Sequence, residues 1–485
     1  MHVVLWDTRK CDVSKDFAGG FGVGQYSGHD GWRGWVIRRF FNRDRRPVAL
    51  LFAHLAAIFR RLGHTVEYAE DRMPEGADLY VFCPSLLTLA LERKVIAEVR
   101  SRNPGARVFV VGLTASVIPE SFSDLDVTIV RGEAEQLYWK LDEVFERPAA
   151  TVNLGIIDDL DRLPLPDWSP FNPQAFSIGY DFWLFPTALI QASRGCTFKC
   201  CYCPYILLDK STRFRDPEAV VDEISYGIRR WKFRSFKFRD PLFGLSRPRV
   251  YRLAELIGRL PRKIQFSVET RTELMPLEIL RVLKDAGLTS ITIGIESPDE
   301  NRLQQYRRLS LSEDRQREFI DVCRKMGIRT VAGFMIGFPD DTVQSIPRVA
   351  QYARMLNPTF ANFNVVTPYP GTEFFAENRD RIAEKDFSRY TSYAPVLNYE
   401  NLTPGELARL HRQCFNHFYF RWGYLRDNAH LLWPGLQRLG LGGKCGVDTV
   451  GDNSNQVISA PLSGMDVLNC KDFRQVSPRS LQITS

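Results

Sequence analysis

Short apolar runs that suit β-strands alternate with amphipathic segments that suit α-helices along most of this chain. In about the first 145 residues we expect strands at 3–6, 65–68, 78–82, 107–111 and 127–130, and helices at 48–62, 91–102 and 135–145. Strands that alternate with helices of this length are typical of a parallel, doubly wound sheet. The sequence therefore predicts an α/β protein whose first domain, residues 1–147, is Rossmann-like.

A proline-rich connector separates this first domain from a second stretch of the same alternation. Residues 161–168 contain two X-Pro steps, which favour extended backbone, so we expect a linker at 148–184. Further strands are expected at 188–192, 235–238, 265–269, 290–295, 330–335 and 362–366. Six such repeats predict a partial or complete β/α barrel over residues 185–395, with its chemistry at the carboxyl ends of the strands.

The β/α alternation stops near residue 395. One helix is expected over 402–432, ended by Pro434 and Gly435, and a tail rich in Gly, Ser and Asn follows it. Such a tail is expected to be loosely ordered. We therefore predict a helical C-terminal region with a loose tail over residues 396–485.

Charge and hydropathy exclude several classes of protein. The chain has 64 Lys plus Arg against 57 Asp plus Glu, and a formal charge of +7 over 485 residues is too mild to support nucleic-acid binding. No apolar run approaches the roughly 20 residues of a membrane span, and no charged-then-apolar leader opens the chain. We expect a cytoplasmic protein that binds no nucleic acid and does not span a membrane.

Three glycine-containing segments follow expected strands of the first domain, at 17–24, 112–114 and 132–133. Ligands of doubly wound sheets lie at the carboxyl ends of the strands, so these segments are candidate ligand loops. Ordinary tight turns explain the same glycines equally well.

Three cysteines, Cys196, Cys200 and Cys203, lie on one short loop directly after the first expected barrel strand. Thiolates at this spacing suit soft metal ions or an iron–sulfur cluster, and three rather than four thiolates leave one iron of a cubane open to another ligand. The alternative is a structural zinc loop with Cys201 as the fourth ligand, although two adjacent cysteines do not easily face one ion. The other cysteines are irregularly spaced, which disfavours a disulfide framework.

The Cys-x3-Cys-x2-Cys spacing after a barrel strand resembles the signature of the radical S-adenosylmethionine enzymes. The segments 294–297, 333–339 and 367–372 resemble further motifs of that family, in the same order. The resemblance implies that the three cysteines hold a 4Fe-4S cluster whose open iron binds S-adenosylmethionine. It also implies reductive cleavage to a 5'-deoxyadenosyl radical, with a small-molecule substrate and an external reductant such as flavodoxin or ferredoxin.

The same resemblance assigns candidate roles around the cofactor. Tyr202 would lie against the adenine, Glu296 and Ser297 would reach the ribose, and Gly333 and Gly337 would let backbone approach the adenine. The chain has Pro298 where relatives often have glycine, which bears on the local loop geometry.

Three charged residues at the second and third strand ends complete the candidate site. A guanidinium such as that of Arg271 can bind the methionyl carboxylate, and a carboxylate can accept from the methionyl ammonium. Asp240 and Glu269 are the carboxylates at these positions, and we take them as the candidate catalytic residues for proton transfer. Each of the three could equally belong to an ion pair at the barrel rim.

The first domain resembles the cobalamin-binding domain that precedes the barrel in one large subgroup of this family. The resemblance rests on the domain's length and position and on the segments 62–66 and 130–135. The D-x-H-x-x-G pattern that supplies a cobalt-ligating histidine elsewhere is absent, and His64 fits a turn between helix and strand better than a cobalt ligand. Cobalamin is thus an implied cofactor, and a vestigial domain is the alternative.

The resemblance favours a cobalamin-dependent methyltransferase that acts on an unactivated carbon of a natural-product intermediate, as in antibiotic biosynthesis. The first alternative is a cobalamin-free dehydratase that deoxygenates a sugar diol of the aminoglycoside type, a lyase-like reaction in which Glu269 or Asp240 would move a proton. The second alternative is a noncatalytic iron–sulfur or corrinoid carrier.

Overall fold

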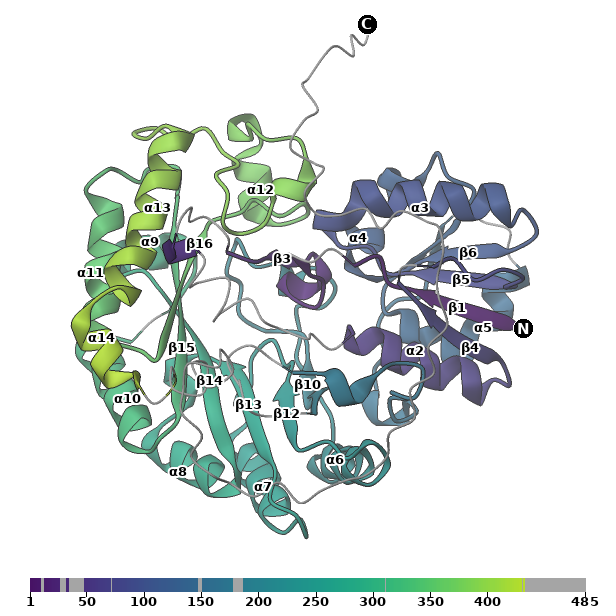
Figure 1. Ribbon diagram of the computed structural model, residues 1–485, viewed down its shortest axis with the longest axis horizontal. Helices are drawn as coiled ribbons and strands as arrows, with labels where there is room; N and C mark the ends of the chain where they lie inside the picture. Colours follow the sequence, from purple (N-terminus) through teal and green to yellow (C-terminus); the bar gives the residue numbers. More distant parts are fainter. Residues whose placement is uncertain are drawn as a thin grey trace, which may run out of the picture. The chain divides into compact units, whose positions relative to one another are not determined.

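Two parallel six-stranded sheets, each with helices packed on it, make up most of the computed structural model of this chain (Figure 1). The structure describes residues 1–9, 13–26, 32–34, 48–70, 72–146, 151–177, 186–309, 311–429 and 431. The tail that we expected to be loosely ordered lies outside these residues. Both sheets belong to one compact unit, residues 1–432.

The first sheet confirms the predicted doubly wound fold. Its strand order is β4-β1-β5-β6-β7-β8, with β1 His2–Trp6, β4 Thr65–Ala69, β5 Leu79–Phe82, β6 Arg107–Val110, β7 Thr128–Arg131 and β8 Thr151–Asn153. Its helices are α2 Leu50–Arg61, α3 Leu89–Arg102, α4 Gly112–Val117 and α5 Leu137–Glu146. All four residues of β5 are buried, as expected for a parallel strand covered on both faces. Because β4 and β5 flank β1, the chain reverses direction across the sheet at the carboxyl ends of β1 and β5, where such folds bind ligands.

Residues 13–26, which we call the hairpin segment, follow β1 and connect the two sheets. They contain the short antiparallel pair β2 Val13–Ser14 and β3 Val23–Gly24. Lys15 Nζ lies 2.9 Å from Asp7 Oδ1 and 2.7 Å from Glu92 Oε1, both in the first domain. The next residue, Asp16, pairs instead with Arg239 of the barrel, at 2.7 Å from its Nε. The glycine-rich stretch of the sequence is therefore part of a bridge between the sheets.

The second sheet is an open, partial barrel rather than a complete one. Its order is β16-β15-β14-β13-β12-β9, with β9 Thr187–Ile190, β12 Ser235–Phe238, β13 Gln265–Thr270, β14 Leu288–Glu296, β15 Arg329–Ile336 and β16 Phe360–Val365. The helices between these strands are α6 Pro217–Trp231, α7 Arg247–Gly258, α8 Leu277–Ala286, α9 Glu300–Gln305, α10 Glu313–Lys325 and α11 Ser345–Leu356. Every pair of neighbouring strands is parallel, so all six carboxyl ends meet at one edge.

As far as residue 431, the C-terminal region contains two helices, α13 Pro404–Tyr419 and α14 Trp422–Asp427, and not the single helix that we predicted over 402–432. The helical path breaks at Arg421, whose backbone is extended and whose Nε donates to the carbonyl of Phe418. Two tyrosine hydroxyls fix this corner against the edge strand: Tyr419 donates to Ala361 O at 2.8 Å and Tyr424 to Thr359 O at 2.9 Å. The two helices can make both of these contacts only if the chain turns between them, so it does not continue as one straight helix. No described helix is long and apolar enough to cross a membrane.

Candidate functional site

The cysteine loop begins where β9 ends and is fixed before its first thiol. Asp240 accepts hydrogen bonds from the backbone N–H of Ala192 at 2.8 Å and from the Ser193 hydroxyl at 2.6 Å. Gly195 has φ +76°, and a Cβ there would lie 1.9 Å from the carbonyl oxygen of Ser211, so this position accepts only glycine. The loop therefore enters the cluster region along one defined path.

The three thiols that we predicted as ligands lie on this loop as free cysteines, each partly exposed. Burial raises the pKa of Cys196 and Cys200, an effect that the nearby guanidinium groups of Arg271 and Arg308 partly offset. Burial raises the pKa of Cys203 to about 12. Because only the thiolate binds iron, metal binding at this loop would release protons.

Cys201 differs from these three cysteines because it is buried and packs in an apolar core. Its N–H donates to the carbonyl of Tyr306 at 3.4 Å, and its own carbonyl accepts from the N–H of Phe374 at 3.1 Å. Among the described residues no three His, Cys, Asp or Glu side chains converge on a single ion. A cubane does not need such convergence, since each thiolate binds a different iron. Three soft donors on one loop therefore fit a 4Fe-4S cluster.

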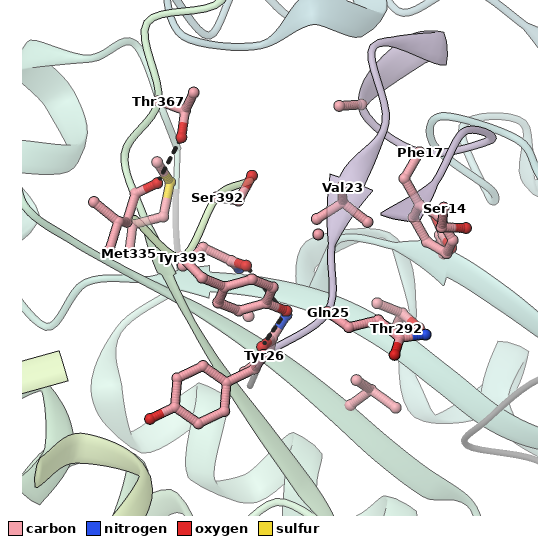
Figure 2. Close-up of a pocket in the computed structure, with 18 of the residues that line it drawn as sticks. Ser14, Phe17, Val23, Gln25, Tyr26, Thr292, Met335, Thr367, Ser392 and Tyr393 are labelled. Carbon is pink, nitrogen blue, oxygen red and sulfur yellow. Dashed lines mark hydrogen bonds between the residues drawn. The ribbon is translucent and has the colours of Figure 1, made fainter. Parts of the chain in front are cut away.

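A cavity of about 430 Å³ adjoins the cysteine loop, between the barrel strands and the hairpin segment. Figure 2 shows Val23 of the hairpin segment on one side of it and Met335 of β15 on the other. Cys203 and Tyr202 also line it, and the Tyr202 hydroxyl is buried with no hydrogen-bond partner. A space that touches both the cluster loop and the barrel interior can hold a cofactor and a substrate together.

The two glycines predicted to lie against adenine are in different environments. Gly333 lines the cavity, and a Cβ there would meet nothing closer than Ile293 O at 3.7 Å, so a methyl group would fit there in ordinary van der Waals contact. Gly337 is absent from the described lining. It has φ +77° in a turn where its N–H donates to Asp341 at 2.7 Å, and a Cβ would lie 2.9 Å from Val365 Cγ1. The fold itself requires glycine at 337 but not at 333.

Glu296 and Ser297 lie at the end of β14, where the pairing with β15 shifts register. Glu296 has φ +68°, a strained conformation for a residue with a side chain, and such strain often accompanies a functional role. Burial raises the pKa of Glu296, against the opposing charge of Arg308, whose Nε lies 3.5 Å from its carboxylate. The hydroxyl of Ser297 accepts from the N–H of Asp299 at 3.1 Å.

Arg271 lies over the cysteine loop, with its guanidinium 4.1 Å from the centre of the Phe198 ring. One of its nitrogens, Nη2, donates to Glu273 at 3.0 Å. The other two, Nε and Nη1, are buried without a hydrogen-bond partner. Two unpaired donors on one buried guanidinium fit a carboxylate ligand such as that of S-adenosylmethionine.

The two candidate catalytic carboxylates also differ. Glu269 lines the cavity between two cations, with its Oε1 at 3.2 Å from Lys237 Nζ and 2.5 Å from Arg239 Nη1. Burial opposes its ionisation, but these two cations hold the pKa of Glu269 below its usual value. Asp240 is buried behind the cysteine loop, and the described lining of the cavity does not include it. Both of its oxygens accept from that loop.

Several cavity residues were missed from the sequence. Lys237 and Arg239 are two residues apart along β12 and its end, and both line the cavity. Asn362 and Asn364 are likewise two apart along β16 and line it from there. The Tyr393 hydroxyl donates to Asn362 Oδ1 at 2.9 Å, and Asn362 Nδ2 donates to Asn364 Oδ1 at 3.1 Å. Polar residues spaced two apart within otherwise apolar strands were the available signal.

Fold and site together define a protein with a three-cysteine loop at the strand ends of a partial β/α barrel, which follows a Rossmann-like domain. The model of the radical SAM superfamily matches residues 190–353, which contain the cysteine loop and strands β12 to β15. Residues 190–353 therefore form a radical SAM domain, and the two-domain fold of the chain is similar to that of a cobalamin-dependent S-adenosylmethionine radical enzyme.

Curated relatives are distant in sequence. An uncharacterized methyltransferase of Pyrococcus horikoshii is 24% identical over 269 residues, which are 55% of this chain and 58% of the relative. The hopanoid C-3 methylase of Methylococcus capsulatus is 27% identical over 422 residues, 79% of each chain. This chain spans about half to two thirds of the length of the first curated relatives that it matches.

A solved structure shares the fold. The cobalamin-dependent S-adenosylmethionine radical enzyme OxsB, with aqua-cobalamin and S-adenosylmethionine bound, superposes with a TM-score of 0.61 at 14% identity. The match covers 91% of this chain and 69% of OxsB. At this identity the likeness supports the arrangement of the two domains and not a shared substrate.

Proposed function

We propose that this chain holds a 4Fe-4S cluster with Cys196, Cys200 and Cys203 and uses S-adenosylmethionine to methylate an unactivated carbon of a small natural-product intermediate. The observation that carries the proposal is the cavity, because one space is lined by Cys203, by the neighbouring Tyr202 and by the inner faces of the barrel strands. The methylase names among the relatives support methyl transfer as the reaction.

When bound, the cluster and S-adenosylmethionine supply a 5'-deoxyadenosyl radical, with the electron drawn from an external donor such as flavodoxin or ferredoxin. The protein's own residues bind and orient. In this proposal Arg271 takes the methionyl carboxylate with its two unpaired donors, and the part of the cavity that Gly333 lines takes the adenine. Glu296 and Ser297 bind the ribose from the end of β14.

Glu269 is the residue proposed to bind the methionyl ammonium or a substrate hydroxyl. Its carboxylate is ionised because Lys237 and Arg239 flank it, and an ionised carboxylate accepts hydrogen bonds or a proton. Asp240 would contribute through the cysteine loop that it holds. The apolar wall of the hairpin segment, with Phe17 and Val23, would keep water from the reacting carbon.

Whether a corrinoid fits depends on the hairpin segment. A Cβ at Gly19 would lie 3.2 Å from both Leu113 Cδ2 and Pro204 O, and one at Gly22 would lie 3.2 Å from Ser85 Cβ. Gly22 therefore packs against the first domain, and Gly19 packs against both the first domain and the cysteine loop, so a corrin ring would not fit against either glycine. On the barrel side, Val23 and Gly24 line the cavity, so a corrinoid would be held on that face, where it would supply the methyl group.

The close packing of Gly19 and Gly22 favours one alternative, a radical reaction without cobalamin, such as dehydration of a sugar diol. In that case the N-terminal domain would serve only as structure. The proposal includes three domain limits: the N-terminal domain ends at residue 147, the linker at residue 184 and the barrel at residue 395.

Metal analysis after anaerobic purification from cobalamin-fed cells tests the proposal. We expect about four irons and one cobalt per chain, deoxyadenosine formation under reductant, and a mass gain of one methyl group on an accepted substrate. Four irons without cobalt would refute the cobalamin-dependent reaction and favour the cobalamin-free one. Iron that remains after Cys196→Ala would refute the cluster assignment itself.

A further inference from the structure

Two carboxylates of the N-terminal domain contact the strand that leads into the cysteine loop. The loop after β7 places Glu135 Oε1 2.8 Å from Arg194 Nη2, and Glu133 Oε1 3.4 Å from Arg194 Nη1. Arg194 is two residues before Cys196. The segment 130–135, for which the cofactor assignments above give no role, therefore lies at the base of the cluster site.

Glu133 also binds a second arginine. Both of its oxygens accept from Arg213, at 2.8 and 2.9 Å, in a bidentate pair, and the N–H of Ile157 donates to it at 2.7 Å. Arg213 lies directly opposite Arg194 in the antiparallel pair of β10 Ser193–Arg194 and β11 Arg213–Phe214. Like charges in opposed positions repel, so one carboxylate between them stabilises the pair that starts the loop.

These ion pairs are shielded from water. The side chains of Glu133, Glu135, Arg194 and Arg213 are between 6% and 13% exposed. In such surroundings salt screens little, and removal of one partner leaves a buried charge without compensation. The contacts are thus strong enough to fix the loop, unlike the exposed pairs elsewhere in the domain.

A short series of direct contacts connects Glu133 to the cysteine loop, so a displacement of its carboxylate would also displace the loop. Arg213 also donates from Nε to Asp209 at 2.7 Å, and Asp209 accepts from the N–H of Ser211 at 2.8 Å. The carbonyl of Ser211 is the group against which Gly195 packs. From Glu133 to the residue before Cys196, every step is a hydrogen bond, an ion pair or a tight contact.

We propose that the N-terminal domain positions the iron–sulfur cluster, with Glu133 as the positioning residue that holds Arg194 and Arg213 and thereby sets the path of the loop into Cys196. The domain then has a role in radical generation whether or not it binds a corrinoid. The inference rests on the radical SAM class of the chain and not on methylation.

The test compares Glu133→Gln with Glu133→Asp, Glu135→Gln and a control, Asp124→Asn. The control breaks an ion pair of the same domain, between Asp124 and Arg93, in which the Asp124 side chain is 62% exposed. Iron and sulfide per chain are measured after anaerobic reconstitution and gel filtration, with the midpoint potential and electron paramagnetic resonance spectrum of the reduced cluster. In the metal-free chain, the alkylation rate of Cys196 by iodoacetamide is followed by mass spectrometry.

In the Glu133→Gln variant we expect the iron content per chain to fall at least about threefold, because the loop is no longer held. For the same reason we expect iodoacetamide to alkylate Cys196 at least about threefold faster. Glu133→Asp is expected to recover part of both values, and Asp124→Asn to match the unmodified protein. Circular dichroism checks the fold, and Glu135→Gln, which leaves Glu133 in place, gives a smaller effect in the same direction if Glu133→Gln fails to fold. A folded Glu133→Gln variant with unchanged iron, potential, spectrum and alkylation rate would overturn the proposal, as would equal losses in Asp124→Asn.

Discussion

Gly333 and Gly337 offer a matched pair of substitutions that separates ligand space from fold. A methyl group at 337 meets Val365 Cγ1 at 2.9 Å and Leu407 Cδ2 at 3.0 Å, at a φ of +77°. The left-handed conformation costs about 1–2 kcal/mol and the overpacking about 1–3 kcal/mol, so Gly337→Ala is expected to lose about 2–5 kcal/mol of unfolding free energy. A methyl at 333 meets no protein atom closer than 3.7 Å. Alanine in a strand is better than glycine by about 0.5–1 kcal/mol, so Gly333→Ala is expected to be neutral or slightly more stable.

For the KM of S-adenosylmethionine we expect the opposite order, with the larger effect in Gly333→Ala and little effect in Gly337→Ala. If adenine fills the space over Gly333, an added methyl overlaps it, and a clash of about 1–3 kcal/mol raises the KM for S-adenosylmethionine by about 5- to 150-fold. Gly337→Ala, where it folds, is expected to keep its KM.

Urea unfolding of the two variants and the rate of deoxyadenosine formation at several S-adenosylmethionine concentrations provide the two measurements. A Gly333→Ala protein with normal KM would show that adenine lies elsewhere. A Gly333→Ala protein that loses stability would show that the cavity is not open at this point.

Three further predictions follow from the site. Cys203→Ser is expected to lose the cluster and Cys201→Ser to keep it, as counted by iron per chain, because only Cys201 packs in the core; equal iron in both would contradict the ligand assignment. Burial raises the pKa of Asp240 from 3.8 to about 6, so the folded state binds the proton more tightly than the unfolded state, and stability falls as pH rises from about 4 to about 6. Asp240→Asn is expected to remove roughly 3 kcal/mol of this fall, seen as flatter urea midpoints against pH, and an unchanged profile would refute the shift. Asp16→Asn breaks the pair with Arg239 and is expected to cost about 1–3 kcal/mol and to speed hydrogen exchange in the hairpin segment; unchanged exchange would show that the pair does not hold it.

The sheets could be predicted from the sequence because buried parallel strands are nearly continuous apolar runs. The expected strand at 78–82 contains β5, Leu79–Phe82, and the expected strand at 330–335 falls inside β15, Arg329–Ile336. The cysteine loop was found for a related reason, since its ligand spacing is local in the chain. Interactions among near neighbours leave a pattern that one sequence can show.

The hairpin segment could not be predicted on the same grounds. Its strands are two residues long, too short for any periodicity, and the partner of Asp16 is 223 residues away. Likewise, nothing local distinguishes Gly333 from Gly337, or Glu269 from Asp240. In each pair the difference is which side of a strand or loop faces the cavity, and distant elements set that. The break at Arg421 was missed because the competing contacts come from β16.

Lys15 and Asp16 are consecutive residues, yet one is anchored to the first sheet and the other to the barrel. One residue inserted between them would add up to about 3.5 Å of chain between the two anchors. The length of this segment is therefore constrained, unlike that of most surface loops. Residues 13–26 carry one wall of the cavity together with both of its anchors, which makes them a natural unit to exchange between relatives when a chimera with altered substrate preference is sought.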